Sequence, residues 1–253
     1  MTESATAGRL DVERLRQTPG LRSARVIGET ASTNSDALTE PRPLLPSLLV
    51  AERQTDGRGR GGHQWSSRPS DLTFSLILDP QALKRTGWVS LCTGFAVALT
   101  CEQFGCRFVG IKWPNDVVVW DRGQLRKLAG VLVETRPDRL VIGVGVNVPK
   151  VEAHFSDRTS IADESGIVPD RTALLSELVS RTIDAVTSGN RSALHQQIER
   201  RNVLKGRAVA ADVGRGLAGG IDPSGRLEVV SDDGDRRLVS SGSVRLLPDT
   251  SHD

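Results

Sequence analysis

The sequence predicts a mixed α+β fold followed by a smaller all-β unit, and three observations carry this prediction. Leucine and phenylalanine alternate with other residues over 72–78, which is the period-two pattern of a strand. Residues 88–99 and 174–186 instead carry apolar side chains at helical spacing. After Leu204, short Val/Leu runs separated by turn residues replace the helical patterns. We therefore expect a sheet covered by helices, and then a separate small barrel.

The individual strands follow from short apolar runs. Residues 24–27 and 48–51 are strand candidates that precede the strand at 72–78. Further along, 117–120 and 128–133 form a plausible antiparallel pair, joined through the polar stretch 121–124. These runs predict a sheet built from segments on both sides of the first helix.

The second helix has a predicted start. Pro169-Asp170 precedes the apolar periodicity of 174–186, and an aspartate there can cap the helix N-terminus. The stretch from Pro149 to Pro169 is polar, irregular and too long for an ordinary connection, so we expect it to be either disordered or a functional loop. The change of pattern at Leu204 divides the chain into residues 1–203 and residues 204–253, whose turns fall at 223–225 and 232–234.

Composition favours a reduced, cytoplasmic protein. The formal net charge of +2 over 253 residues argues against a polyanion-binding surface. Cys92, Cys101 and Cys106 are odd in number and lack metal-ligand spacing. No run approaches the roughly 20 apolar residues of a membrane span, and residues 1–8 lack a secretory signal pattern. We expect no membrane partner.

Residues 54–65, Gln-Thr-Asp-Gly-Arg-Gly-Arg-Gly-Gly-His-Gln-Trp, are the most informative stretch. Glycines let backbone amides approach a phosphate or carboxylate, and Arg58 and Arg60 add permanently charged bidentate donors. The pattern indicates a flexible clamp for an anion. A solvated turn and a nucleic-acid contact are the alternatives when the loop is taken alone.

Two later segments carry a related signal. Pro114 keeps Trp113 extended and excludes a helix at Lys112-Trp113-Pro114-Asn115-Asp116. The predicted strand pair places Asn115 and Asp116 at the start of one strand and Lys127 at the start of the other. All three side chains should then lie within reach of one another. Each segment taken singly is also explained as a turn or a strand-edge lysine.

In these segments and two others, the sequence resembles the biotin protein ligases, also called biotin-[acetyl-CoA-carboxylase] ligases. The matching segments occur in the family's order, and a weaker match continues through 219–227 and 241–242. The five ordered segments are 32–34, 54–65, 112–116, 127–134 and 141–147. The resemblance implies a catalytic domain like that of class II aminoacyl-tRNA synthetases and a C-terminal SH3-like barrel.

The resemblance also implies a two-step acyl transfer. Biotin is activated with ATP to biotinyl-5'-AMP, and the biotinyl group then passes to a lysine of a biotin carboxyl carrier domain of an acyl-CoA carboxylase. Mg²⁺ would accompany ATP. Because a carboxylate must approach a triphosphate, preorganised positive charge is the largest available catalytic contribution. The sequence does not distinguish a monomer from a homodimer.

The match assigns roles residue by residue. Lys127 and Arg60 are the candidate catalytic residues, and Asp116 is a possible Mg²⁺ ligand. The biotin-binding candidates are Ser32, Thr33, Asn34, Gln54, Gly57, Arg58, Gly59, Arg60, Lys127 and Gly130. The nucleotide-binding candidates are Arg58, Arg60, Trp65, Lys112, Asn115 and Asn147. Two alternatives stay open: the polar residues at 32–34 also form a helix-capping sequence, and Asn147 before Pro149 also fits a turn.

Departures from the family pattern limit the match. His63 stands where most members have a third arginine, and Asp56 occupies a position that is usually small and neutral. About twenty residues precede the first strand, which leaves no room for a winged helix, so we expect a bacterial-type member without DNA binding. A lipoate ligase would share the chemistry, but its Arg-Arg-x-Ser-Gly-Gly-Gly segment is absent from the sequence. A nucleic-acid-binding protein and a non-catalytic adaptor are the remaining alternatives.

Overall fold

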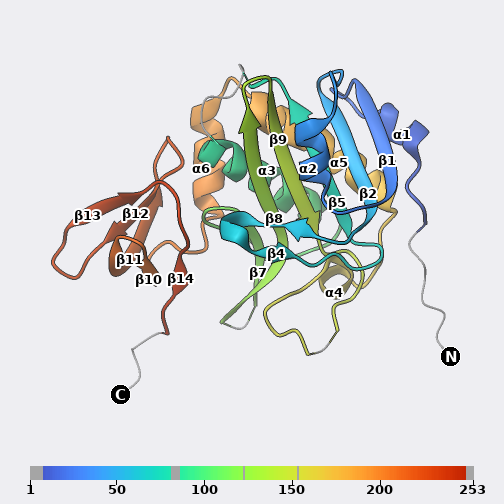
Figure 1. The fold of residues 1–253 in the computed structure, drawn as a ribbon. Helices are drawn as coiled ribbons and strands as arrows, with labels where there is room; N and C mark the ends of the chain where they lie inside the picture. Colours follow the sequence, from blue (N-terminus) through green and yellow to red (C-terminus); the bar gives the residue numbers. More distant parts are fainter. Residues whose placement is uncertain (1–7, 81–85, 122, 153, 249–253) are drawn as a thin grey trace.

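The computed structural model describes residues 8–80, 86–121, 123–152 and 154–248. Its described strands form a seven-stranded sheet, a five-stranded sheet and a two-stranded sheet, and helices pack on the largest one (Figure 1). The larger sheet has seven strands in the order β1-β2-β5-β9-β8-β7-β6. In that order they span Ser23–Thr30, Ser47–Gln54, Leu72–Leu78, Arg139–Val146, Gln124–Arg136, Asp116–Asp121 and Val109–Lys112. The pair β1·β2 is parallel and the other neighbours are antiparallel. The predicted mixed α+β class is confirmed.

Helices cover both faces of this sheet. The helix α3 (Thr86–Gln103) packs on β6 and β8, and α5 (Arg171–Thr187) packs against α3. The shorter α2 (Thr33–Thr39) lies on the opposite face, over β5 and β9, with its own apolar cluster of Ala37, Leu49, Ile77 and Val141. Because both faces are covered, every residue of β5 and β9 is buried.

Both predicted helices are present, and Asp170 caps α5 by accepting a hydrogen bond from the Ala173 backbone N–H at 2.9 Å. Two further helices, α1 (Val12–Arg16) and α6 (Arg191–Arg200), lie outside the sequence prediction. None of the described helices is long and apolar enough to cross a membrane. The three cysteines are buried and free.

The segment after β9 contains a short helix that the sequence prediction did not include, and its role as a functional loop stays a prediction. Instead of remaining irregular throughout, residues 149–169 contain the helix α4 (Ile161–Ser165), which Ser160 caps. Arg158 also forms a β-bridge with Lys127. The short helix was missed because its five residues give too few turns for a periodic signal.

The C-terminal part forms a five-stranded antiparallel sheet in the order β13-β12-β11-β10-β14 (Figure 1). In that order the strands span Arg236–Val239, Leu227–Val230, Gly214–Ile221, Ala208–Ala211 and Arg245–Leu246. It docks on the larger part through buried contacts, among them a hydrogen bond of 2.9 Å from Trp113 Nε1 to the Gly225 carbonyl. The predicted small β unit after Leu204 is therefore present as a docked sheet.

Candidate active site

A cavity of about 590 Å³ lies on the α2 face of the larger sheet. Its lining combines the sheet, the Gly/Arg loop and the C-terminal part, so residues far apart in sequence meet there. The lining residues are Ser32, Thr33, Asn34, Gln54, Arg58, Gly59, Arg60, Gly61, His63, Gln64, Trp65, Thr73, Phe74, 112–116, Lys127, 130–132, 143–145, Asp212 and 242–244.

The floor of the cavity is a row of small residues across the sheet. Thr73, Gly145, Gly130 and Asp116 lie opposite one another on β5, β9, β8 and β7. A Cβ added at Gly145 would approach the Trp65 indole to between 2.3 and 2.7 Å, and one added at Gly130 would meet the same ring at 3.2 Å. Glycine at these two positions therefore lets Trp65 lie flat on the sheet.

Lys127 reaches this floor because β8 contains a bulge. Lys127 and Gly130 are three residues apart, so a regular strand would place their side chains on opposite faces. The pairing with β7 shifts between Val117 and Val118, which makes Leu128 the extra residue and returns Lys127 to the cavity face. Lys127 thus lies inside β8 and not at its start, which corrects the expectation from sequence.

The predicted proximity of Lys127 and Asp116 is confirmed. Lys127 Nζ lies 2.7 Å from Asp116 Oδ1 and 5.4 Å from the centre of the Trp65 ring. Burial lowers the pKa of the Arg60 guanidinium, and the negative charge of Asp116 opposes that shift. A partly desolvated cation of this kind is stabilised by an anion, so this end of the cavity suits a carboxylate or a phosphate.

The Gly/Arg loop is a short hairpin. The strands β3 (Gly57–Arg58) and β4 (Gln64–Trp65) pair, and the 3-10 turn η1 (Arg60–Gly62) joins them with positive φ at Gly61 and Gly62. Arg58 Nη2 contacts Glu134 Oε1 at 2.6 Å, which ties the hairpin to β8. The loop is thus anchored at its start and built from residues that permit backbone rearrangement.

The opposite end of the cavity is lined by polar side chains, and the Arg58–Glu134 ion pair contacts this end through Asn34. The Thr33 backbone N–H and hydroxyl both donate to Gln54 Oε1, at 2.8 and 3.0 Å. Ser75 Oγ donates to Asn34 Oδ1 at 2.6 Å, and Asn34 Nδ2 donates to Glu134 Oε2 at 2.9 Å. The capping interpretation of residues 32–34 is confirmed for Ser32, which caps α2. All three residues line the cavity, and their contact with a ligand stays a prediction.

Two buried polar atoms on the floor lack a partner among the described residues. These are Trp65 Nε1 and Thr73 Oγ1, and both residues line the cavity. A buried donor or hydroxyl without a hydrogen bond is costly, of the order of 1–3 kcal/mol. Both atoms therefore mark positions where a bound molecule can supply the missing partner.

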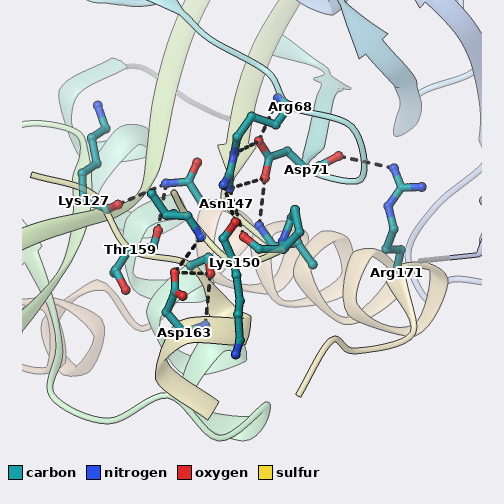
Figure 2. Close-up of polar contacts among 12 residues, drawn as sticks. Arg68, Asp71, Lys127, Asn147, Lys150, Thr159, Asp163 and Arg171 are labelled. Carbon is teal, nitrogen blue, oxygen red and sulfur yellow. Dashed lines mark hydrogen bonds and ion pairs between the residues drawn. The ribbon is translucent and has the colours of Figure 1, made fainter. Parts of the chain in front are cut away.

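A second polar network lies behind the cavity and holds the backbone of Lys127 (Figure 2). Asn147 Nδ2 donates to the carbonyls of Lys127 and Thr159, at 3.1 and 2.9 Å. The Lys127 N–H donates to the Asp157 carbonyl at 2.8 Å. Figure 2 shows the Lys127 ammonium pointing away from this network, and Lys127 lines the cavity. The network fixes the main chain of Lys127 and does not engage its ammonium, which pairs with Asp116 in the cavity.

The buried carboxylate of Asp71 anchors the same region. Arg68 donates to it from Nε at 3.1 Å and Nη2 at 3.0 Å, and the Val148 N–H donates at 3.0 Å. Burial raises the pKa of Asp71, and the hydrogen bonds from Arg68 and Val148 oppose that rise. Arg68 Nη1 and Nη2 also donate to the carbonyls of Lys150 and Pro149, which fastens the segment after β9.

Most of the predicted site residues line the cavity, but Gly57 and Asn147 lie outside its lining. Gly57 closes the hairpin, since a Cβ there would lie 2.4 Å from the Trp65 carbonyl. Asn147 supports the Lys127 backbone, and its contact with a nucleotide stays a prediction. Sequence reasoning missed Thr73 and Asp212 as lining residues, because the signals that place them there come from sheet register and domain docking.

The donor set fits a phosphate-bound Mg²⁺ better than a protein-held metal. Among the described residues, no three His, Cys, Asp or Glu side chains gather at a site that could hold a metal ion. Mg²⁺ usually takes one or two carboxylates and completes its shell with waters and substrate phosphates. Asp116 lies at the cationic end of the cavity and provides one such carboxylate.

Comparisons with known proteins identify the family. Residues 23–147 match the model of the biotin/lipoate A/B protein ligase family, and residues 201–247 match that of the biotin protein ligase C-terminal domain. A curated relative from Mycobacterium tuberculosis, named biotin--[acetyl-CoA-carboxylase] ligase, is 33% identical over 244 residues, with 89% of each chain covered. The bifunctional ligase/repressor BirA of Escherichia coli is 31% identical, with 88% of this chain and 74% of the relative covered.

A solved structure of a biotin protein ligase has a similar fold. The biotin protein ligase from Aquifex aeolicus, solved in complex with biotin and ATP, superposes with a TM-score of 0.79 at 28% identity. The match covers 89% of this chain and 100% of that one. The fold and the site thus define a member of the biotin and lipoate ligase class. Within that class, the chain belongs to the biotin protein ligases.

Proposed function

We propose that this protein is an ATP-dependent biotin protein ligase that modifies a lysine of a biotin carboxyl carrier domain. The single observation that carries the proposal is the cavity floor, where Lys127, Asp116 and Arg60 meet, with the polar residues Thr33, Asn34 and Gln54 at the other end. An amphiphilic molecule with a carboxylate at one end and an amide-like ring at the other matches this distribution. The names of the relatives from Mycobacterium tuberculosis and Aquifex aeolicus support biotin and ATP as the substrates.

The polar end suits the ureido ring of biotin. Thr33, Asn34 and Gln54 are held in place by the hydrogen bonds they exchange with one another and with Ser75. Preorganised donors and acceptors are needed here because a desolvated ring must have its polar atoms satisfied. Ser32, Gly130 and the Gly/Arg hairpin then enclose the rest of the molecule, which directs its carboxylate toward Lys127.

The cationic end suits the nucleotide. Trp65 offers an apolar face to the adenine base, and Arg60, Lys112 and Asn115 line the cavity where phosphates would lie. Arg58, which is held by Glu134 in this structure, is a further candidate for the phosphates. Lys112 and Asp116 are directly opposite each other on β6 and β7, so a cation and a carboxylate are available for the polyphosphate and its Mg²⁺. Mg²⁺ bound there would neutralise charge on the phosphates, with Asp116 as its protein ligand.

The residues of the chain then have defined tasks in the two steps. Lys127 lies between the two ends and neutralises both the biotin carboxylate and the α-phosphate while the carboxylate oxygen attacks phosphorus and pyrophosphate leaves. Arg60 and the hairpin hold the mixed anhydride and keep water away from it. The lysine amine of the carrier then attacks the acyl carbon, the bond to AMP breaks, and the amine loses its proton.

The finer assignments complete the proposal. The catalytic domain, residues 1–203, is of the class II aminoacyl-tRNA-synthetase type, and residues 204–253 form an SH3-like barrel that assists nucleotide closure or carrier docking. The enzyme works in the cytoplasm, where ATP and carboxylases are found. The five-stranded sheet, whose strands all lie after residue 204, and the match of residues 201–247 to the C-terminal ligase domain support the division.

Incorporation of labelled biotin into a purified carrier domain tests the proposal. The purified enzyme should label the carrier only when ATP is present, and a carrier whose acceptor lysine is replaced by arginine should stay unlabelled. Labelled lipoate serves as the competing substrate and should not be incorporated. Absence of biotin incorporation under these conditions, or efficient transfer of lipoate, would show that the proposed activity is wrong.

A further inference from the structure

The C-terminal sheet contributes a carboxylate to the rim of the cavity. Asp212 lies in the turn between β10 and β11 and lines the cavity together with 242–244. Gly242 has a φ of +108°, and a Cβ at this position would lie 2.0 Å from Asp212 Oδ2. The carboxylate therefore packs directly on the Gly242 backbone, so two separate turns of the C-terminal sheet set its position.

The charges around the cavity make this carboxylate unusual. Four basic side chains line the cavity, against the two carboxylates of Asp116 and Asp212; the basic residues are Arg58, Arg60, Lys112 and Lys127. Of these, Arg58 is paired with Glu134, which lies outside the lining. Asp116 is paired with Lys127 at 2.7 Å. In the described part of the chain, no hydrogen bond or ion pair engages the Asp212 carboxylate. Among the described residues, the Asp212 carboxylate thus has no cationic partner at the edge of a cavity in which basic side chains outnumber carboxylates.

Asp212 does not assist the binding of the first two substrates by direct attraction. A biotin carboxylate and an ATP polyphosphate are anionic, so a carboxylate near them is repulsive. The third reactant has the opposite charge, because a lysine amine with an ordinary pKa near 10.4 arrives as an ammonium. To reach the adenylate, that ammonium has to pass side chains that repel it.

We propose that Asp212 receives the ammonium of the carrier lysine as it enters the cavity and aligns it with the adenylate. This inference rests on the proposed ligase function and extends it to the recognition of the second substrate. Asp212 acts by charge and position before the amine loses its proton. Its contribution should therefore belong to the transfer step alone, and not to formation of the adenylate.

The test compares Asp212→Asn with wild type in the two half-reactions. Asn keeps the shape of the side chain and removes its charge. Biotin-dependent pyrophosphate exchange should stay within about twofold of wild type, while single-turnover transfer from bound adenylate to the carrier should fall by about tenfold. Asp212→Glu should restore most of the transfer rate. Asp233→Asn, in the exposed turn between β12 and β13, makes the same charge change outside the cavity lining and should leave both rates unchanged.

Discharge of the adenylate by neutral hydroxylamine separates attraction of an ammonium from general damage to the site. The Asp212→Asn enzyme should react with hydroxylamine at the wild-type rate, since that nucleophile carries no charge to attract. Unchanged carrier transfer in Asp212→Asn would overturn the proposal. So would a weaker pyrophosphate exchange with a raised Mg²⁺ requirement, because that result would place Asp212 on the nucleotide metal. If wild type lacked biotin-dependent exchange, the proposed function itself would have failed.

Discussion

The buried ion pair between Arg68 and Asp71 makes a quantitative prediction about stability. Asp71 is fully buried and the Arg68 side chain is 23% exposed, so Arg68→Met leaves a carboxylate without its cation in a place where water cannot replace it. Removing one partner of a buried pair typically costs 3–5 kcal/mol. Asp71 would keep its bonds from the backbone N–H groups of Val148 and residue 68, so we expect the lower end, about 3 kcal/mol at pH 8.

The loss should depend on pH, with a sign that follows from the pKa of Asp71. Burial already raises this pKa in the folded protein, and loss of the Arg68 charge should raise it further. A carboxyl with a raised folded pKa binds more protons in the folded state than in the unfolded state, so stability falls as pH rises through the range above the ordinary Asp value. The deficit of Arg68→Met should therefore be smaller at pH 5 than at pH 8, because protonated Asp71 needs no cation.

Urea unfolding of both proteins at the two pH values measures this difference. Arg53→Met is the matched control, since Arg53 pairs with Glu29 on the surface and side-chain exposures are 61% and 55%. Such exposed pairs contribute at most about 1 kcal/mol. A deficit below about 1 kcal/mol for Arg68→Met, or a deficit of the same size at both pH values, would refute this reasoning.

Two further predictions concern the cavity floor and the thiols. Gly145→Ala should lower biotin-dependent pyrophosphate exchange by about 100-fold, because the new methyl group displaces the Trp65 ring, whereas Gly189→Ala, whose Cβ would meet nothing within 4 Å, should not change it. Activity of Gly145→Ala near the wild-type level would disprove the tight packing of Trp65. Burial raises the pKa of Cys92 to about 12, and Cys101 and Cys106 are also buried, so iodoacetamide at pH 8 should leave the native thiols unmodified and alkylate them after unfolding. Rapid labelling of the native protein would contradict that burial.

The sequence predicted the parts of the structure that local patterns encode. The strand at 72–78, the two long helices and the Asp170 cap follow from periodicity and capping chemistry. The meeting of Asp116 with Lys127 was also predictable, because the two runs on either side of 121–124 pair in a hairpin. Because these two strand runs are consecutive in the chain and joined by a short connection, few pairings other than a hairpin are open to them.

Other features depend on contacts between distant segments, which no local pattern reveals. The bulge at Leu128 decides on which face Lys127 lies, and it is set by pairing with β7. The closeness of Trp65 to Gly145 arises only when β5, β9 and the hairpin come together. Asp212 enters the cavity lining because the C-terminal sheet docks on the larger part, so its position requires the tertiary structure.

Biotin-dependent exchange of labelled pyrophosphate into ATP tests most directly the claim that Lys127 activates biotin. Wild type should exchange label only when biotin is present. Lys127→Ala should reduce the rate by about 100-fold or more while remaining folded, because a charge contact made in the transition state is lost. Lys150→Ala, at an exposed lysine outside the cavity lining, should exchange like wild type. Exchange without biotin, or a Lys127→Ala rate within twofold of wild type, would contradict the account.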